Sequence, residues 1–203
     1  MKIIAIGRNY AAHAKELNNP VPDKPVIFLK PDTAVLKDDK PFYIPEFSSE
    51  IHYELEVVLK ICKEGKHISE KFAPNYYDEI GLGVDFTARD IQNIHKEKGL
   101  PWELAKAFDH SAAISRFIPK TEFTDIKNLD FELKINGESR QTGNTKNMLF
   151  SFEQIIAFVS QYITLKKGDL IFTGTPEGVG KINKTDKIAA WLENRQLLGF
   201  DIK

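Results

Sequence analysis

The segment "HYELEVVLKI" (residues 52–61) constrains this 203-residue chain most, because it combines strand periodicity with two acidic side chains. Successive side chains of a strand point to opposite faces of the sheet. One face of this strand is therefore wholly apolar and consists of Tyr53, Leu55, Val57, Leu59 and Ile61. The other face consists of His52, Glu54, Glu56, Val58 and Lys60. Burial of two unpaired carboxylates is unfavourable by several kcal/mol each, so this face either meets solvent or binds a cation.

The spacing alone leaves both interpretations open. A half-exposed strand is the commoner arrangement, because antiparallel sheets often have one wet face. A cation site needs further acidic side chains, and Asp85 is a candidate because it ends the apolar run "EIGLGVD". A lone aspartate at such a place is more often a helix cap or a turn residue. Three converging carboxylates would suit Mg²⁺ or Mn²⁺, which are hard cations with oxygen ligands.

The length and composition indicate one ordinary globular domain over 1–203, or at most two small ones. Hydrophobic residues make up 42% of the chain and charged residues 28%, and the net charge is −1. This balance gives no sign of a nucleic-acid or membrane partner. Cys62 is the only cysteine, which excludes an internal disulfide and a cysteine-based zinc cluster within one chain. The apolar run at the start is too short for a signal peptide and is interrupted by Arg8, so we expect a cytoplasmic protein.

Strand-like segments dominate the rest of the chain. "KIIAIG" predicts a strand that ends at Gly7, and "PWELAKAFDHSAAI" (101–114) is interpreted as a loop followed by a further strand. Asn136 and Gly137 stand between two strand-like halves, which is the strongest short signal for a β-hairpin.

The predicted helices are few and short. Asn9 is expected to cap a helix that ends at residue 18 or 19, and Thr87 is expected to cap a second one. The clearest helix follows Ser151, which forms a capping box with Gln154.

Two glycine-rich stretches fail as nucleotide-binding motifs. "GLGVDF" (81–86) lacks the third glycine of the dinucleotide fingerprint. In "GTPEGVGKI", five residues separate Gly174 from Gly180, and Ile182 replaces the Ser or Thr that would coordinate magnesium. The segment "GTPEGVG" is then either a backbone-lined turn near a ligand or an ordinary tight turn, and the glycines alone favour the ordinary turn.

Three further side chains could carry chemistry. In a helix, the spacing of His13 and Glu16 places both on one face, and a glutamate that orients an imidazole makes a general base near neutral pH. Surface His–Glu pairs are nevertheless commoner. Lys106 stands between two alanines in an aromatic-rich stretch and could face an anionic substrate, although most lysines are solvated.

Six motifs together resemble the fumarylacetoacetate hydrolase superfamily, and most of all its small single-domain acylpyruvase and oxaloacetate decarboxylase members. In chain order they are "GRNYAAHAKEL", "PVIFLKP", "HYELEVVL", "VDFTARDIQ", "KGLPWELAKAFD" and "IFTGTPEGVG". The resemblance implies a strand-dominated α+β fold, which is a mixed β-roll of layered sheets with few short helices.

The resemblance also implies roles for residues that match the family's motifs. The implied metal ligands are Glu54, Glu56 and Asp85, the implied catalytic residues are His13, Glu16 and Lys106, and the implied substrate-binding residues are Arg8, Arg89, Gln92 and Thr175. One departure is Ile6, which stands near the place of a further acidic ligand in the eponymous hydrolase. This departure weakens fumarylacetoacetate itself as the substrate.

The implied activity is Mg²⁺- or Mn²⁺-dependent cleavage of a C–C bond in a small 2-oxo acid through a metal-stabilised enolate. Hydrolysis of an acylpyruvate and decarboxylation of oxaloacetate both fit. Isomerisation or tautomerisation of a 2-hydroxy-dienoate or an oxaloacetate-type diacid is the alternative. A metal-binding module without activity is a second alternative, against which the presence of His13, Glu16 and Lys106 together argues. The resemblance further implies a homodimer.

Overall fold

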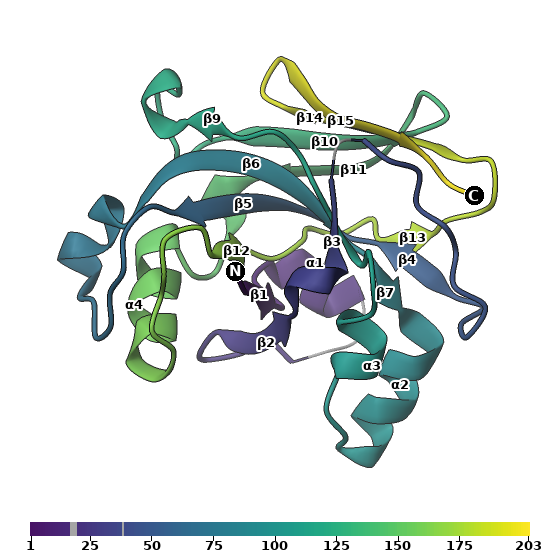
Figure 1. The fold of residues 1–203 in the computed structure, drawn as a ribbon, viewed down its shortest axis with the longest axis horizontal. Helices are drawn as coiled ribbons and strands as arrows, with labels where there is room; N and C mark the ends of the chain where they lie inside the picture. Colours follow the sequence, from purple (N-terminus) through teal and green to yellow (C-terminus); the bar gives the residue numbers. More distant parts are fainter. Residues whose placement is uncertain (17–19, 38) are drawn as a thin grey trace.

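The computed structural model describes residues 1–16, 20–37 and 39–203. Strands dominate these residues, and a curled mixed sheet forms the centre of the molecule (Figure 1). The strand-dominated α+β fold expected from the sequence is confirmed.

The central sheet has eight strands. Its order is β2-β1-β12-β5-β6-β8-β3, and β9 pairs with β6. The pairs β1/β12 and β3/β8 are parallel, and the other pairs are antiparallel. The bounds are β1 Ile3–Gly7, β2 Val26–Lys30, β3 Val35–Leu36, β5 Leu55–Ile61, β6 Tyr77–Asp85, β8 Ala112–Ile114, β9 Ile118–Pro119 and β12 Leu170–Phe172.

Two smaller sheets complete the strand layers. The four-stranded sheet β11-β10-β14-β15 lies above the long strands β5 and β6 in Figure 1, and the three-stranded sheet β13-β4-β7 lies beside their ends. The bounds are β4 Ile51–Tyr53, β7 Thr87–Ala88, β10 Asp130–Ile135, β11 Glu138–Asn144, β13 Gly180–Lys181, β14 Lys187–Leu192 and β15 Arg195–Asp201. The hairpin predicted at Asn136 and Gly137 joins β10 to β11, and both residues have the positive φ that its tight turn requires.

The helices of the described residues are short. They are α1 Ala11–Glu16, α2 Arg89–Lys98, α3 Glu103–Lys106 and α4 Phe152–Tyr162, with single 3₁₀ turns at Asp32–Ala34, Lys120–Glu122 and Thr145–Asn147 and a longer one at Glu70–Asn75. The capping box predicted at the start of α4 is present, since Ser151 Oγ accepts from the Gln154 N–H and Gln154 Oε1 accepts from the Ser151 N–H. Among the described residues, no helix has the length and apolar character needed to cross a membrane.

The main hydrophobic core lies between the central and the four-stranded sheet. The apolar face predicted for residues 52–61 belongs to this core. Val58, on the opposite face of β5, packs in a second cluster with residues such as Ile3 and Phe172. Both faces of β5 are therefore covered, so the half-exposed strand considered above is wrong for this segment.

The segment 52–61 is two strands rather than one. It breaks at Glu54, so that β4 belongs to the three-stranded sheet and β5 to the central sheet. At the break, the Leu55 N–H donates to the side chain of Gln141 (2.9 Å), which satisfies the backbone where strand pairing stops.

Three other local expectations are wrong. Asn9 does not cap α1, because its side chain bonds instead to the backbone of Phe150 and Thr173. Thr87 lies in β7, and α2 begins without a side-chain cap. Part of the loop expected within 101–114 forms the single turn α3, although the strand expected after it is present as β8. The predicted end of the first helix, at residue 18 or 19, lies outside the described residues.

Gly83 of β6 offers a test of the packing in the second cluster, which includes Val58 and Phe172. A Cβ at this position would collide with the ring of Phe172 and lie 2.9 Å from Val58 Cγ2, whereas a Cβ at Gly7 would meet only ordinary contacts. We expect Gly83→Ala to lower the free energy of unfolding by about 1–3 kcal/mol relative to Gly7→Ala, measured by urea denaturation. The comparison cancels the entropic effect of adding a methyl group to the unfolded chain. Equal denaturation midpoints for the two variants would contradict the packing described here.

Candidate active site

Strand register brings the three predicted acidic side chains together. In the antiparallel pair β5/β6, Leu55 pairs with Val84, and the Asp85 N–H donates to the Glu54 carbonyl oxygen (2.8 Å). Glu54 and Glu56 therefore lie at the start of β5, beside Asp85 at the end of β6. One carboxylate oxygen from each residue lies within 4.8 Å of the other two. Their exposed fractions are 5%, 2% and 0%, so water does not compensate their charge.

Three cationic side chains pair with two of these carboxylates. Lys106 Nζ bridges Glu54 Oε2 (2.8 Å) and Asp85 Oδ2 (2.7 Å). Arg89 forms an ion pair with Glu54, and Lys30 Nζ lies 2.6 Å from Asp85 Oδ1. Burial raises the pKa of the Glu54 carboxyl, but the charges of Lys106 and Arg89 outweigh it and hold that pKa well below its usual value.

Glu56 is the carboxylate without a cationic partner among the described residues. Its Oε2 accepts the N–H of Gly174 (2.7 Å). Burial and the like charges of Asp85 and Glu54 raise the pKa of Glu56 well above its usual value. This uncompensated buried acid, together with two further acidic oxygens at ligand spacing, fits a hard divalent cation. The donor set therefore fits Mg²⁺ or Mn²⁺.

The turn "GTPEGVG" lies against the site and holds two acids through its backbone. Gly174 and Gly178 have φ of +100° and +93°, the left-handed region that favours glycine. The Gly174 N–H binds Glu56, and the Gly178 N–H donates to Glu16 Oε1 (3.0 Å). A Cβ at Gly178 would lie 2.6 Å from the Arg140 carbonyl oxygen. The turn therefore positions site residues, unlike the ordinary turn favoured by the glycines alone.

The predicted His–Glu pair forms on α1. His13 Nδ1 lies 3.1 Å from Glu16 Oε2. His13 is buried, whereas Glu16 is exposed at the outer end of the pair. When His13 donates its Nδ1 proton to Glu16, Nε2 is the basic nitrogen, which is the arrangement of an oriented general base.

One small cavity, of about 30 Å³, collects the predicted site residues. Those that line it are Arg8, His13, Glu54, Glu56, Asp85, Arg89, Gln92, Lys106 and Thr175. Glu16 does not line the cavity and contacts it only through His13. Ile6 also lines it, so this position contributes an apolar wall.

The sequence analysis missed two buried residues that support the site. Lys30 donates to Ser111 Oγ (3.1 Å) and to the Lys106 carbonyl oxygen, in addition to its contact with Asp85. The sequence signal for Lys30 was its place at the end of the apolar strand "VIFLK", where no polar alternation indicates a solvent-exposed position. Gln141 donates to Thr175 Oγ1 (2.9 Å) from the distant strand β11, and no local pattern marks it.

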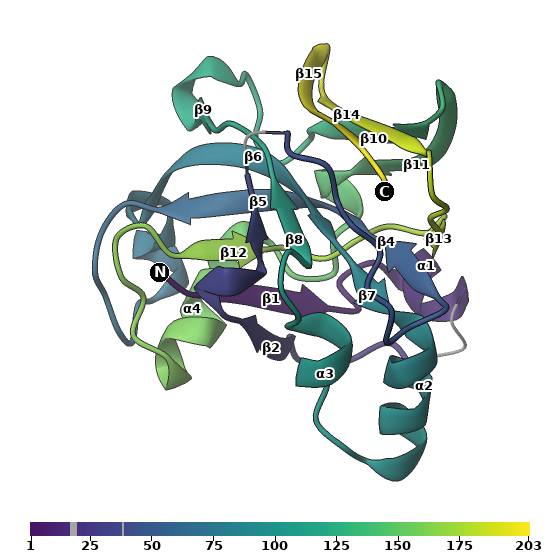
Figure 2. The same cartoon turned by 45° about the vertical axis from the view of Figure 1, so that its right-hand side comes forward.

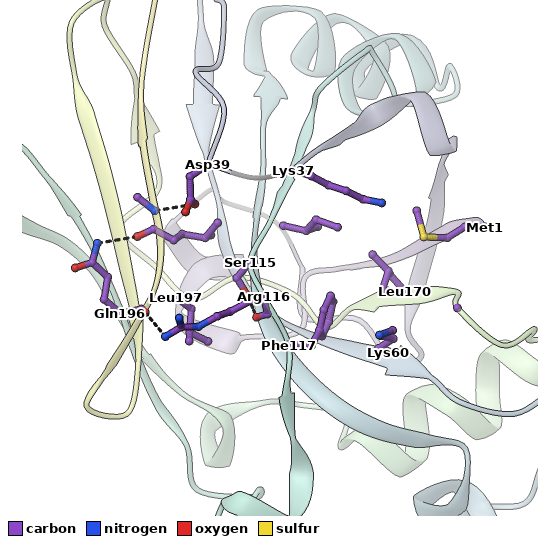
Figure 3. A pocket seen from close by; sticks show the side chains of 14 residues that line it. Met1, Lys37, Asp39, Lys60, Ser115, Arg116, Phe117, Leu170, Gln196 and Leu197 are labelled. Carbon is purple, nitrogen blue, oxygen red and sulfur yellow. Dashed lines mark hydrogen bonds between the residues drawn. The ribbon is translucent and has the colours of Figure 1, made fainter.

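A much larger cavity of about 670 Å³ lies elsewhere, between β15 and the central sheet (Figure 3). Its lining mixes apolar side chains such as Phe117 and Leu170 with the charged Lys37, Lys60 and Arg116. The potential metal-binding cluster of the described residues lies in the small cavity and not here. The size of a cavity therefore does not identify the candidate active site of this protein.

Comparison with known proteins shows which family the chain belongs to. Residues 2–202 match the family model described as fumarylacetoacetate (FAA) hydrolase C-terminal. The chain belongs to this family.

Two relatives and one solved structure illustrate the match. The mouse protein "Oxaloacetate tautomerase FAHD1, mitochondrial" is 44% identical over 201 residues, which are 99% of this chain and 91% of that protein. "Oxaloacetate decarboxylase, mitochondrial" of Dictyostelium discoideum is 44% identical over 182 residues, covering 89% of this chain and 84% of that protein. The crystal structure of fumarylpyruvate hydrolase from Pseudomonas aeruginosa in complex with Mn²⁺ and pyruvate superposes with a TM-score of 0.94 at 32% identity, over 100% of this chain and 89% of that one.

The acidic cluster predicts that Glu56→Gln weakens binding of Mg²⁺ or Mn²⁺ by tens of fold or more, because it replaces an anionic oxygen ligand with a neutral one. Isothermal titration calorimetry measures this affinity. Glu79→Gln on β6 is the matched control, since Glu79 pairs with Lys60 outside the cavity and its loss should leave the affinity unchanged. An unchanged affinity in a folded Glu56→Gln variant would show that Glu56 is not a ligand.

Proposed function

We propose that this protein is a divalent-metal-dependent enzyme that cleaves a C–C bond in a small 2-oxo acid, with oxaloacetate decarboxylation and acylpyruvate hydrolysis as the leading reactions. One observation carries the proposal. Three buried carboxylates at metal-ligand spacing share a cavity with a buried lysine and with His13, which Glu16 orients. The names of the relatives, which act on oxo acids, support the same substrate class.

Glu54, Glu56 and Asp85 would hold Mg²⁺ or Mn²⁺, which supplies Lewis-acid polarisation of the substrate's 2-oxo oxygen when bound. The complex of the Pseudomonas relative with Mn²⁺ and pyruvate supports a metal of this class beside a 2-oxo acid.

Lys106 is the residue that stabilises negative charge as the C3–C4 bond breaks. Burial lowers the pKa of Lys106, but the charges of Asp85 and Glu54 outweigh this effect. The pKa is therefore raised above its usual value, and the side chain stays cationic. A fixed cation in a buried site stabilises a developing enolate without costly reorganisation. Arg89, Gln92 and Thr175 bind and orient the substrate from the cavity wall. The bond from Arg89 to Gln92 Oε1 (2.5 Å) fixes their relative position.

His13, oriented by Glu16, is the general base of the proposed mechanism. In acylpyruvate hydrolysis it removes a proton from the water that attacks the distal carbonyl carbon. In oxaloacetate decarboxylation CO₂ leaves without a water nucleophile, so the rate of this reaction depends less on His13.

Tautomerisation of an oxaloacetate-type diacid or isomerisation of a 2-hydroxy-dienoate is the second candidate. The His13–Glu16 pair favours it, because a base at the cavity wall can remove a proton from C3 while the 2-oxo oxygen gains one, and the reverse transfer restores the keto form. The tautomerase name of the mouse relative is consistent with this candidate.

Turnover of oxaloacetate and of acetylpyruvate, each with Mg²⁺ and with Mn²⁺, tests the proposal. Release of pyruvate supports bond cleavage, whereas loss of the enol absorbance without pyruvate release supports tautomerisation. A protein that binds the metal but turns over neither compound would be the inactive module considered from the sequence.

A homodimer in the cytoplasm is the expected state of the enzyme. We also propose one catalytic domain over residues 1–203, supported by a core that includes both Ile4 and Ile202. The mass of one chain is 23.1 kDa, and sedimentation velocity at micromolar concentration should give twice this mass. A single species at the mass of one chain would contradict the dimer.

His13 and Lys106 should separate the two leading reactions. His13→Ala removes the base that activates water, so hydrolysis of acetylpyruvate should fall by about 10²–10⁴-fold, with a smaller loss for oxaloacetate decarboxylation. Lys106→Ala removes the charge beside the enolate and should reduce decarboxylation more than His13→Ala does. Steady-state kinetics with saturating metal measures both, and Lys15→Ala on the exposed side of α1 serves as the control. Equal fractional losses in both reactions would mean that the two residues serve one shared step.

A further inference from the structure

Two cationic side chains of the small cavity have no acidic partner among the described residues. Arg8 and Lys96 both line it, together with Trp102. In contrast, Arg89 and Lys106 are each paired with a carboxylate of the acidic cluster. Arg8 Nε is buried and donates to no partner within the described structure, and the same is true of Arg89 Nε. An unpartnered buried guanidinium nitrogen at a cavity points to an anion that is bound there during function.

Lys96 lies on the cavity side of α2. Arg89, Gln92 and Lys96 follow one another at helical spacing and all line the cavity. Arg89 stands at the acidic cluster, and Lys96 is seven residues further on, about 10 Å along the helix axis. The helix therefore carries a second cation on the same wall, beyond the residues that face the metal ligands.

Trp102 fixes where the Lys96 ammonium group lies. Lys96 Nζ is 5.7 Å from the centre of the Trp102 ring, a cation–π contact that leaves its N–H donors available. The Trp102 ring in turn packs against Phe28, which also lines the cavity. The lysine is thus held at an apolar wall and is not free in solvent.

Arg8 has an unusual backbone. Its φ is +60°, in the left-handed region that residues other than glycine rarely adopt. Such strain persists where the surrounding structure imposes it, and it occurs disproportionately at functional sites. This conformation directs the chain from β1 past the cavity and keeps Arg8 in its wall.

Several cationic side chains line the cavity near Lys96, among them Arg8 and Arg89. Burial and the charges of Arg89 and Arg8 lower the pKa of Lys96 to about 8. The three buried carboxylates and the three cations that pair with Glu54 and Asp85, which are Lys30, Lys106 and Arg89, are equal in number, so Arg8 and Lys96 are additional positive charges of the cavity lining. A divalent metal would therefore leave excess positive charge, which a substrate with two carboxylates neutralises better than a substrate with one.

We propose that Lys96 and Arg8 form a subsite for a second carboxylate, so that the enzyme selects 2-oxo dicarboxylates over 2-oxo acids with an uncharged distal end. This inference rests on the proposed function and specifies its substrate class.

Binding of two non-reacting acids tests the subsite without turnover. L-Malate and L-lactate both offer a carboxylate and a 2-hydroxyl group to a metal, but only malate has a distal carboxylate. With Mg²⁺ present, calorimetry should show that the wild type prefers malate. Lys96→Gln should reduce that preference about tenfold or more through weaker malate binding alone, and Lys96→Arg should largely restore it. Lys98→Gln, which removes one charge from an exposed position of the same helix, should leave the preference unchanged.

The outcomes distinguish the subsite from the proposed activity. Equal weakening of malate and lactate by Lys96→Gln, or an equal loss of preference in Lys98→Gln, would overturn the subsite in favour of a general charge effect. Wild-type protein that prefers malate through Lys96 but turns over neither oxaloacetate nor acetylpyruvate would support the subsite and refute the proposed function. If both hold, Lys96→Gln should raise the KM for oxaloacetate and leave that for acetylpyruvate nearly unchanged.

Discussion

Three carboxylates buried within one small cavity are the constraint on which the rest of this structure depends. Burial of Glu54, Glu56 and Asp85 is tolerable only because nearby groups compensate their charge. Lys106, Arg89 and Lys30 come from α3, α2 and β2, so the need for compensation ties three separate elements to the ends of β5 and β6 (Figure 2). Glu56 remains the acid that a bound cation would stabilise.

Backbone N–H groups also position the acidic side chains of the site. The glycine turn after β12 donates one N–H to Glu56 and another to Glu16, so a single turn holds both the acidic cluster and the His–Glu pair. Donors of this kind are rigid and carry no net charge. They orient acids without neutralising them, which is compatible with the proposed roles of Glu56 as a metal ligand and of Glu16 as the group that orients His13.

In the proposed mechanism, the cavity combines an electron sink with a base, and one such site would serve hydrolysis, decarboxylation and tautomerisation alike. The three reactions would then share the build-up of negative charge beside Lys106 and differ in whether a water, a carboxylate or a proton takes part. On this proposal, the distal end of the cavity decides the reaction and the substrate. In this protein that end is lined by cations and by Trp102 rather than by further acids.

The local sequence determined the features that depend on short-range physics. The alternation in residues 52–61 predicted the core face of β4 and β5, Asn136–Gly137 predicted its hairpin, and Ser151 with Gln154 predicted the start of α4. Ordered motifs shared with a family predicted the acidic cluster and the residues around it. Tertiary structure alone decided that the segment breaks at Glu54, that Lys30 is buried against Asp85, and that Gln141 supports the break from a strand 86 residues away. These features depend on which strands become neighbours, and strand pairing over such separations has no signature in local periodicity or propensity.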